Sequence, residues 1–388
     1  ETKAGEGLRA LAVAWRTLEK DRPEAGDESE LVVAGLCLFA DPPKPSAAAA
    51  IARLAAAGVT VKVISGDAPE VVRHLVGALG MPPGALLAGP DIARLSDDAL
   101  AARVVDTELF ARVSPDQKTR IIRALQARGR TVGFLGDGIN DAPAIKAADV
   151  GMSVDEATDV ARAAADMILL APDLGVLADG VEEGRRTYAN VMKYIRMGTS
   201  SNFGNMLSMA FASLFLPFLP LTPVQVLINN LLYDISEIGI PFDSVDAADV
   251  ARPHGWNMAE VLRFTLIMGP LSSVFDIATF AALRWLDAAP QVFRAAWFVE
   301  SMATQILVIF LIRTARPFWT SRPHPVLVAS SLAPLAAAMA LALTPLGAGL
   351  GFISPAPLVL GLVAALTGLY LVCAEALKST ALAADARR

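Results

Sequence analysis

Six long apolar segments dominate the second half of this 388-residue chain and constrain its fold. A helix needs roughly 20 residues to cross the hydrocarbon core of a bilayer, and each segment approaches that length. We expect six membrane-spanning helices over residues 197–219, 221–241, 261–286, 294–313, 325–345 and 355–377. Six spans return the chain to the side on which they began. The lipid bilayer is therefore one expected partner.

Charge is distributed unevenly along the chain. Of 33 basic and 39 acidic residues, about two thirds precede Asn190, so the first half is expected to be a soluble acidic domain. A pI near 5.3 offers no basic surface for nucleic acid. Cys37 and Cys373 lie in separate apolar runs, and we expect both to be buried free thiols.

Strands and helices are predicted to alternate in the first half. Leu31–Ala40 is an apolar run that is too short to span a bilayer and is expected to form a buried strand. Further strands are predicted at 59–64, 109–113, 131–135, 150–154 and 167–170, with helices between them. This order predicts a parallel α/β sheet, in which chemistry gathers at the carboxyl ends of the strands.

The segment Gly136-Asp137-Gly138-Ile139-Asn140-Asp141 follows one predicted strand directly. Two carboxylates four residues apart, with an amide between them, can bind a hard cation, and the glycines permit close backbone approach. Taken alone, such a segment is as often a solvated turn. Its place at the end of a strand favours the functional interpretation.

Three further segments carry weaker signals. Ser65-Gly66-Asp67 follows a strand and could bind phosphoryl oxygens, Lys118 at a helix start could neutralise them, and Asp41-Pro42-Pro43-Lys44 is a rigid acidic turn. Each alone is better explained by an ordinary turn or a surface charge. Leu174–Arg196 is expected to be a charged helical stalk that runs directly into the first span.

Polar residues also occur at membrane depth. Carboxylates and amides are costly in lipid, so they face partners or a pathway. The first two spans contain Asn202, Asn205, Asn230, Asp234 and Glu237. Amides can equally act as polar contacts between helices, an alternative that is much weaker for Asp234.

Three polar residues lie in the third and fourth spans. We favour a structural hydrogen-bond role for Asp276 over an ion-binding role. Glu300 is close to a span end and is expected to face water, and Gln305 follows it at membrane depth.

Taken together and in this order, the four soluble segments resemble the phosphorylation domain of P-type ATPases, a branch of the haloacid dehalogenase fold. Their Gly-Asp-Gly-x-Asn-Asp motif matches Gly136–Asp141, and their Asp-Pro-Pro-Arg motif matches Asp41–Lys44 with lysine in place of arginine. The resemblance implies ATP and Mg²⁺ as cofactors and assigns roles to particular residues. It implies catalytic roles for Ser65, Gly66, Asp67, Lys118, Asp137, Asn140 and Asp141. It implies nucleotide contacts for Asp41, Lys44, Gly136 and Gly138. It also implies that Asp137 and Asp141 bind the catalytic Mg²⁺.

The resemblance extends into the membrane region. It implies that the transported cation is bound by Asn202, Asn205, Asn230 and Asp234. The stretches around Asn230–Asp246, Asp276 and Glu300 resemble the magnesium-transporting group, which implies Mg²⁺ import. One carboxylate among amides also suits a partly hydrated Mg²⁺ better than Ca²⁺.

The sequence departs from the family pattern at the nucleophile. No Asp-Lys-Thr-Gly-Thr or Thr-Gly-Glu-Ser segment occurs in it. We therefore expect the C-terminal part of a pump that is inactive without its N-terminal half. The expected divisions are a nucleotide-domain tail at 1–30, a phosphorylation domain at 31–173, a stalk at 174–196, six spans within 197–377 and a tail at 378–388.

Three alternatives remain open. The chain could be a membrane-tethered phosphatase, a catalytically incomplete scaffold or part of a Ca²⁺ pump. A phosphatase would need an Asp-x-Asp pair before Ser65, and none is visible. Arginines and lysines near the span ends, among them Arg252, Arg313 and Lys378, place the soluble domain in the cytoplasm, beside the cell (inner) membrane.

Overall fold

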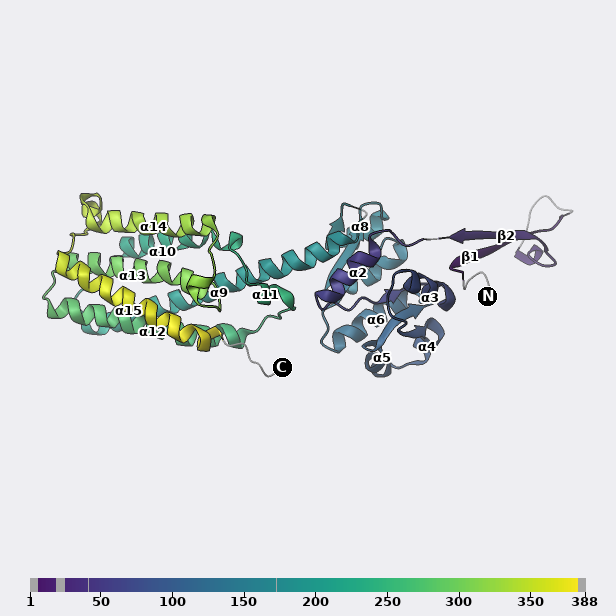
Figure 1. Ribbon diagram of the computed structural model, residues 1–388, viewed down its shortest axis with the longest axis horizontal. Coiled ribbons are helices and arrows are strands. Elements are labelled where there is room, and N and C mark those ends of the chain that lie inside the picture. Colours follow the sequence, from purple (N-terminus) through teal and green to yellow (C-terminus); the bar gives the residue numbers. More distant parts are fainter. Residues whose placement is uncertain (1–5, 19–24, 41, 172, 383–388) are drawn as a thin grey trace. The chain divides into compact units, whose positions relative to one another are not determined.

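The computed structural model describes residues 6–18, 25–40, 42–171 and 173–382. The chain divides into two compact units, Glu1–Val181 and Glu182–Arg388. Each unit has its own buried core, and the two are described separately below (Figure 1).

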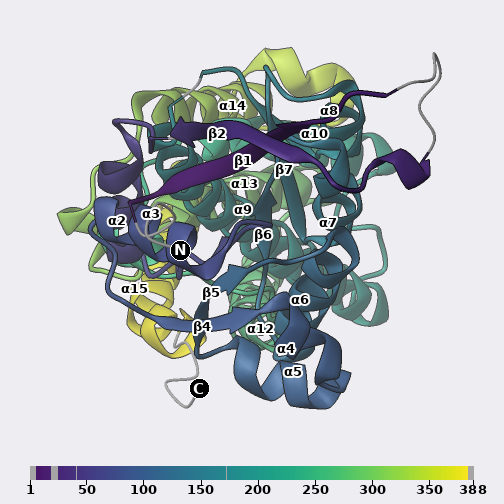
Figure 2. The ribbon, with the colours of Figure 1, turned by 90° about the vertical axis from the view of Figure 1, so that its right-hand side faces the viewer.

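The first unit begins with an antiparallel hairpin of β1 (Leu8–Trp15) and β2 (Val32–Ala40). The two strands run side by side in Figure 2. Every residue of β2 is exposed, so the prediction of a buried strand over Leu31–Ala40 is wrong. The hairpin pairs only with itself among the described strands, and neither face is covered by another element there. For the same reason Cys37 is exposed, against the prediction, whereas Cys373 is partly buried; both thiols are free.

Two three-stranded parallel sheets form the centre of the first unit. One has the order β3 (Val63–Ile64), β5 (Thr107–Ala111) and β4 (Ala85–Ala88). The other has the order β6 (Gly133–Leu135), β7 (Val150–Val154) and β8 (Met167–Leu169). The predicted parallel strands are thus present. The cores of the two sheets meet at Ile64 and Val132, which pack against both.

Seven helices belong to this unit alone within the described residues. They are α2 (Ala47–Ala56), α3 (Pro69–Ala78), α4 (Gly89–Arg94), α5 (Asp97–Val104), α6 (Pro115–Ala127), α7 (Ala142–Ala147) and α8 (Asp159–Ala164). The elements β4, α4 and α5 were not anticipated. Gly84, Gly89 and Pro90 bound or begin β4 and α4, and all three elements are short, with at most eight residues, which leaves little periodicity for a sequence pattern to detect.

A 41-residue helix, α9 (Gly175–Phe215), contains both the expected stalk and the first apolar segment. The later helices of the second unit are α10 (Pro223–Glu237), α11 (Ala247–Ala251), α12 (Met258–Trp285), α13 (Pro290–Ile312), α14 (Pro325–Leu343) and α15 (Pro357–Leu382). Short 3-10 turns include η2 (Ile139–Asp141) in the first unit and η3 (Ile240–Phe242) in the second.

Four of these helices, α12 to α15, are long and apolar enough to cross a membrane. This supports a multi-pass membrane region and confirms four of the six predicted spans by length and composition. Within the described residues, α10 is shorter than such a span and α9 is mixed in character. Helix α13 lies among its neighbours in Figure 1, and most of its residues are buried.

Candidate functional site

The loop after β6 is shaped by a glycine that no other residue could replace without movement. Gly136 donates its N–H to Met152 in β7, and its carbonyl accepts a hydrogen bond from Ser153 Oγ at 2.9 Å. A Cβ atom at Gly136 would lie 2.6 Å from Cβ of Asp141. The close approach therefore brings the loop from Gly136 to Asp141 back on itself, at the carboxyl end of a parallel strand.

Asp141 forms the central ion pair of this loop. Lys118 Nζ donates to its Oδ1 at 2.6 Å, and the backbone N–H of Gly138 donates to its Oδ2 at 3.2 Å. Asp141 is only 9% exposed. Lys118 is presented by the start of α6, where Ser114 and Gln117 form a reciprocal capping box. Both carboxylate oxygens of Asp141 are thus engaged by the protein.

Asp137 and Asn140 are the exposed members of the same loop. Thr158 fixes the backbone of Asp137, donating to its carbonyl from N at 3.1 Å and from Oγ1 at 3.3 Å. An exposed carboxylate on a fixed backbone suits Mg²⁺, which takes one or two protein carboxylates and completes its shell with water and phosphate oxygens. Among the described residues, no group of three acidic, histidine or cysteine side chains forms a closed metal cage.

Ser65 and Asp67 close a tight turn at the end of β3. Ser65 Oγ donates to Asp67 Oδ2 at 2.8 Å, and the N–H of Asp67 donates back to Ser65 Oγ at 3.1 Å. Arg112, just after β5, donates its N–H to the carbonyl of Asp67. Gly66 is exposed between them. This turn therefore lies at the carboxyl edge of the first parallel sheet.

The remaining predicted nucleotide contacts give less information. Asp41 lies outside the described residues. Lys44 is exposed just before α2, where its carbonyl accepts the N–H of Ala47. Gly138 is half-buried and supplies the N–H that binds Asp141.

In the second unit, a groove of about 440 Å³ lies between α9 and the end of α10. Asp234 and Glu237 line it together with Asn190, Tyr194 and Pro241. Asp234 is exposed, whereas Glu237 is 5% exposed. The groove therefore offers two carboxylates, whereas the four residues predicted to bind the transported cation include only one, Asp234.

The other predicted cation ligands occupy different positions. Asn202 and Asn230 are exposed on α9 and α10. Asn205 instead donates Nδ2 to Gln305 Oε1 on α13 at 3.0 Å. Among the described residues, no hydrogen bond joins Asn205 to Asp234 or to the other two asparagines.

Two acidic residues lie deeper in the bundle. Asp276 on α12 accepts hydrogen bonds from Ser208 Oγ and Trp297 Nε1, which confirms the predicted structural role. Glu300 on α13 is 1% exposed, so the prediction that it faces water is wrong. Ten residues of α13 separate it from the start of that helix, which places it among neighbouring helices rather than at a span end.

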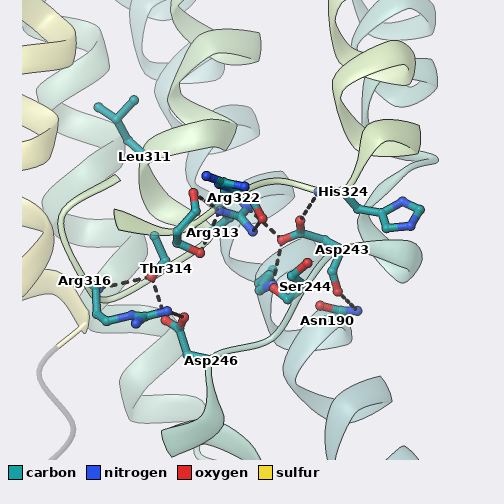
Figure 3. Close-up of polar contacts among 12 residues, drawn as sticks. Asn190, Asp243, Ser244, Asp246, Leu311, Arg313, Thr314, Arg316, Arg322 and His324 are labelled. Carbon is teal, nitrogen blue, oxygen red and sulfur yellow. Dashed lines mark hydrogen bonds and ion pairs between the residues drawn. The ribbon is translucent and has the colours of Figure 1, made fainter. Parts of the chain in front are cut away.

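A buried ion cluster that sequence reasoning missed surrounds Asp243, in the loop after α10 (Figure 3). Its Oδ2 accepts from Lys193 Nζ and from Arg313 Nε, each at 2.8 Å, and its Oδ1 accepts from the N–H of His324. Burial acts to raise the pKa of Asp243, but Arg313 and Lys193 outweigh it and hold that pKa below its usual value. The partners are 50 and 70 residues away in sequence, so no local pattern reveals them.

Comparison with known families matches both units. Residues 6–149 match the haloacid dehalogenase-like hydrolases, and residues 218–380 match the C-terminus of cation-transporting ATPases. Over 355 residues the chain is 47% identical to a magnesium-transporting P-type ATPase of Salmonella typhimurium, covering 89% of this chain and 39% of that protein. An Escherichia coli K12 relative described in the same words is 49% identical over 327 residues, which are 82% of this chain and 36% of that protein.

A calcium-transporting ATPase of Bacillus subtilis is 38% identical over 236 residues, which are 60% of this chain and 26% of that protein. The chain thus spans about two fifths of the length of the magnesium-transporting relatives and less of the calcium-transporting one. With its hydrolase-like sheets, its apolar helices and these matches, the chain belongs to the cation-transporting P-type ATPases and is similar to their magnesium-transporting members.

Proposed function

We propose that this chain is the C-terminal part of an ATP-driven pump that imports Mg²⁺ into the cytoplasm across the cell (inner) membrane. ATP is the proposed energy source, and Mg²⁺ serves both as catalytic cofactor and as transported ion. The first unit would lie in the cytoplasm, in agreement with the positive charges near the helix ends. The N-terminal half of the pump would supply the phosphorylated aspartate.

The Lys118–Asp141 ion pair is the observation that carries the catalytic part of this proposal. An ammonium group held at the carboxyl ends of parallel strands can neutralise negative charge on a transferred phosphoryl group. Asp141 would keep Lys118 Nζ in place, so that little reorganisation is needed during the reaction. This gives Asp141 a positioning role in addition to the metal-binding role that the family resemblance implies.

The exposed groups nearby would complete the phosphoryl site. Asp137 would hold the catalytic Mg²⁺, with Asn140 and Asp141 shaping its surroundings. The ion would supply charge neutralisation at the phosphoryl oxygens. Ser65 Oγ and the N–H groups of the Ser65–Asp67 turn would donate hydrogen bonds to the same oxygens.

The groove lined by Asp234 and Glu237 is the proposed part of the ion pathway. Asn202, Asn205 and Asn230 would add neutral oxygens as the helices move during transport. A site with few carboxylates suits Mg²⁺, which often keeps some of its waters, better than Ca²⁺, which takes six to eight oxygen ligands. The names of the relatives at 47–49% identity support the same choice of ion.

The proposed membrane domain has six helices. The second part of α9 and the whole of α10 would join α12 to α15, giving spans within residues 197–377. The first part of α9, within 174–196, would be a stalk that carries conformational change from the phosphorylation domain at 31–173. Residues 1–30 would be the tail of a nucleotide domain, and 378–388 a cytoplasmic tail.

Two substitutions in the complete transporter test this function. Asp137→Asn should abolish phosphoenzyme formation from labelled ATP, because losing a metal-ligand charge costs several kcal/mol, while membrane insertion stays normal. Asp234→Asn should abolish Mg²⁺-dependent growth of an uptake-deficient host. Asp97→Asn, which changes a carboxylate paired with Arg120 and 88% exposed, is the matched control and should behave as wild type.

The outcomes separate the alternatives. ATPase activity that responds to micromolar Ca²⁺ and not to transported Mg²⁺ would assign the pump to calcium. Normal growth with Asp234→Asn would remove this residue from the pathway. A complete protein that neither forms a phosphoenzyme nor restores growth would indicate a scaffold.

A further inference from the structure

Two carboxyl groups face each other in the interior of the helical unit. Asp276 lies on α12 and Glu300 on α13, and each is 1% exposed. Trp297, which donates to Asp276, precedes Glu300 by one turn of α13, so the two carboxyl groups lie close enough to interact. Both lie in helices apolar enough to cross a membrane, where an isolated charge is costly.

The two carboxyl groups differ in the hydrogen-bond donors that surround them. Ser208 Oγ donates to Asp276 Oδ2 at 2.6 Å, and Trp297 Nε1 donates to Oδ1 at 2.7 Å. Asp276 therefore has a donor at each oxygen, as an ionised carboxylate requires. Neither carboxyl oxygen of Glu300 has such a donor among the described residues. A buried carboxylate without donors is strongly disfavoured.

Among the residues that the structure describes, no positive charge pairs with either carboxyl group. The neighbouring polar side chains that interact with the two carboxyl groups are Ser208 of α9, Trp297 of α13 and Tyr370 of α15. None of these is a lysine, arginine or histidine. Two adjacent carboxylates in such surroundings cannot both be ionised, because like charges repel and burial disfavours each charge.

A single bound proton would both give Glu300 a hydrogen-bond partner and remove the repulsion between two buried carboxylates. If Glu300 carries it, the contact becomes an O–H···O⁻ hydrogen bond in which Glu300 donates and Asp276 accepts. Glu300 then has a partner, and the pair carries one negative charge, which Ser208 and Trp297 also stabilise. A metal ion is a poorer occupant, because the described residues offer no third acidic, histidine or cysteine ligand.

A small cavity of mixed polar and apolar lining lies among α9, α12, α13 and α15, the helices that surround this pair. Its volume is about 10 Å³, enough for a single water molecule. Ser200, Ser201, Ser272, Gln305 and Tyr370 contribute to its lining. Tyr370 also lies close enough to Asp276 and Glu300 to interact with both. Gln305, another residue of the lining, donates Nε2 to Oγ of Ser301, the residue after Glu300, at 2.6 Å.

We propose that Asp276 and Glu300 form a proton-binding site, in which they share one proton that exchanges with solvent by way of Tyr370 and the small cavity that Tyr370 lines. The site is distinct from the groove at Asp234 and does not depend on which ion that groove carries. Its occupant is a proton taken from water. Glu300 is the donor and Asp276 the acceptor.

Infrared difference spectroscopy of the full chain in lipid bilayers tests the site directly, through the carbonyl stretch of a protonated carboxyl group at neutral pH. Subtracting the Glu300→Gln spectrum from that of the wild type should reveal such a band. Asp276→Asn should keep the band but shift its frequency, because an amide is a weaker acceptor than a carboxylate. Glu375→Gln is the matched control, since Glu375 is ion-paired with Lys378 and should contribute no protonated band.

Folding is checked separately. Glu300→Gln should keep the wild-type melting temperature, because its amide can still donate to Asp276, whereas Glu300→Ala should lower it. If Glu300→Gln fails to fold, the Asp276→Asn frequency shift still decides the question. A wild-type spectrum without a band that depends on Glu300, or a band that Asp276→Asn leaves unmoved, would overturn the shared proton.

Solvent exchange tests the cavity. In D₂O the band of the folded chain should shift to the frequency of a deuterated carboxyl group, and Tyr370→Phe should slow this shift. A band that stays protonated in D₂O until the chain unfolds would overturn the exchange route.

Discussion

Arg313 on α13 and Lys193 on α9 donate to the same oxygen of Asp243, each at 2.8 Å. The three side chains are almost fully buried, with Asp243 only 2% exposed. Asn190 adds hydrogen bonds from α9 to the carbonyls of Pro241 and Asp243. The carboxylate of Asp243 thus joins the loop after α10 to both helices, and Asn190 adds a further contact with α9.

Asp243→Ala should lower the free energy of unfolding of the helical unit by about 3–5 kcal/mol, because it leaves two buried cations without a counter-charge. Thermal or denaturant unfolding in detergent measures this. Glu182→Ala is the control: Glu182 pairs with Arg186 on the exposed surface of α9 and should cost about 1 kcal/mol or less. Equal effects of the two substitutions would contradict the importance of the buried pair.

The ion pairs of Asp243 also predict that the stability of the helical unit depends on pH. The folded-state pKa of Asp243 is lowered relative to an unfolded value of about 3.9. Its contribution is therefore complete above that unfolded value and is lost as the pH falls through the folded-state pKa. We expect the free energy of unfolding, measured from pH 7 to pH 3, to differ between wild type and Asp243→Asn by a constant amount at first. This difference in free energy should become smaller at the acidic end of the range. If this difference in free energy instead grew as the pH fell, the folded-state pKa of Asp243 would be raised rather than lowered, and the prediction would be wrong.

Gly136→Ala should disturb the proposed phosphoryl site. The added Cβ would lie 2.6 Å from Asp141 Cβ, so the loop must shift and the ion pair with Lys118 must lengthen. Misplacement of about 1 Å can cost on the order of 100-fold in rate, so ATPase activity of the complete transporter should fall strongly. Gly77→Ala on α3 meets no atom within 4 Å and should leave activity unchanged. Wild-type activity of Gly136→Ala would show that the loop tolerates the displacement.

Glu237→Gln should weaken cation binding. Glu237 is the buried carboxylate of the groove that also contains Asp234, so its charge should attract the ion at close range. We expect the half-saturating Mg²⁺ concentration for transport to rise about tenfold or more, equivalent to about 1.4 kcal/mol. Glu375 lies near the C-terminal end of α15 and does not line the groove, so Glu375→Gln should leave the half-saturating Mg²⁺ concentration unchanged. A concentration unaffected by Glu237→Gln would exclude this carboxylate from the pathway.

Local patterns succeeded where the signal lies within a few residues. The turn at Ser65–Asp67 and the loop at Gly136–Asp141 both follow parallel strands as predicted. Patterns failed for the apolar run at Leu31–Ala40, because hydrophobicity alone does not say what covers a strand. They also failed for Glu300, whose burial depends on packing by helices distant in sequence.

The sequence by itself determined the division into a charged α/β part and an apolar helical part, because strand and helix periods and segment length are local properties. It also determined the motifs that identify the family. Only the tertiary structure decided that Asp141 pairs with Lys118, that Glu237 shares a groove with Asp234, and that Glu300 meets Asp276. The first and third pairs join residues on different elements, and Asp234 and Glu237 of α10 share a groove because α9 forms its other wall. The packing of elements that are distant in sequence therefore sets the burial that gives each charge its role.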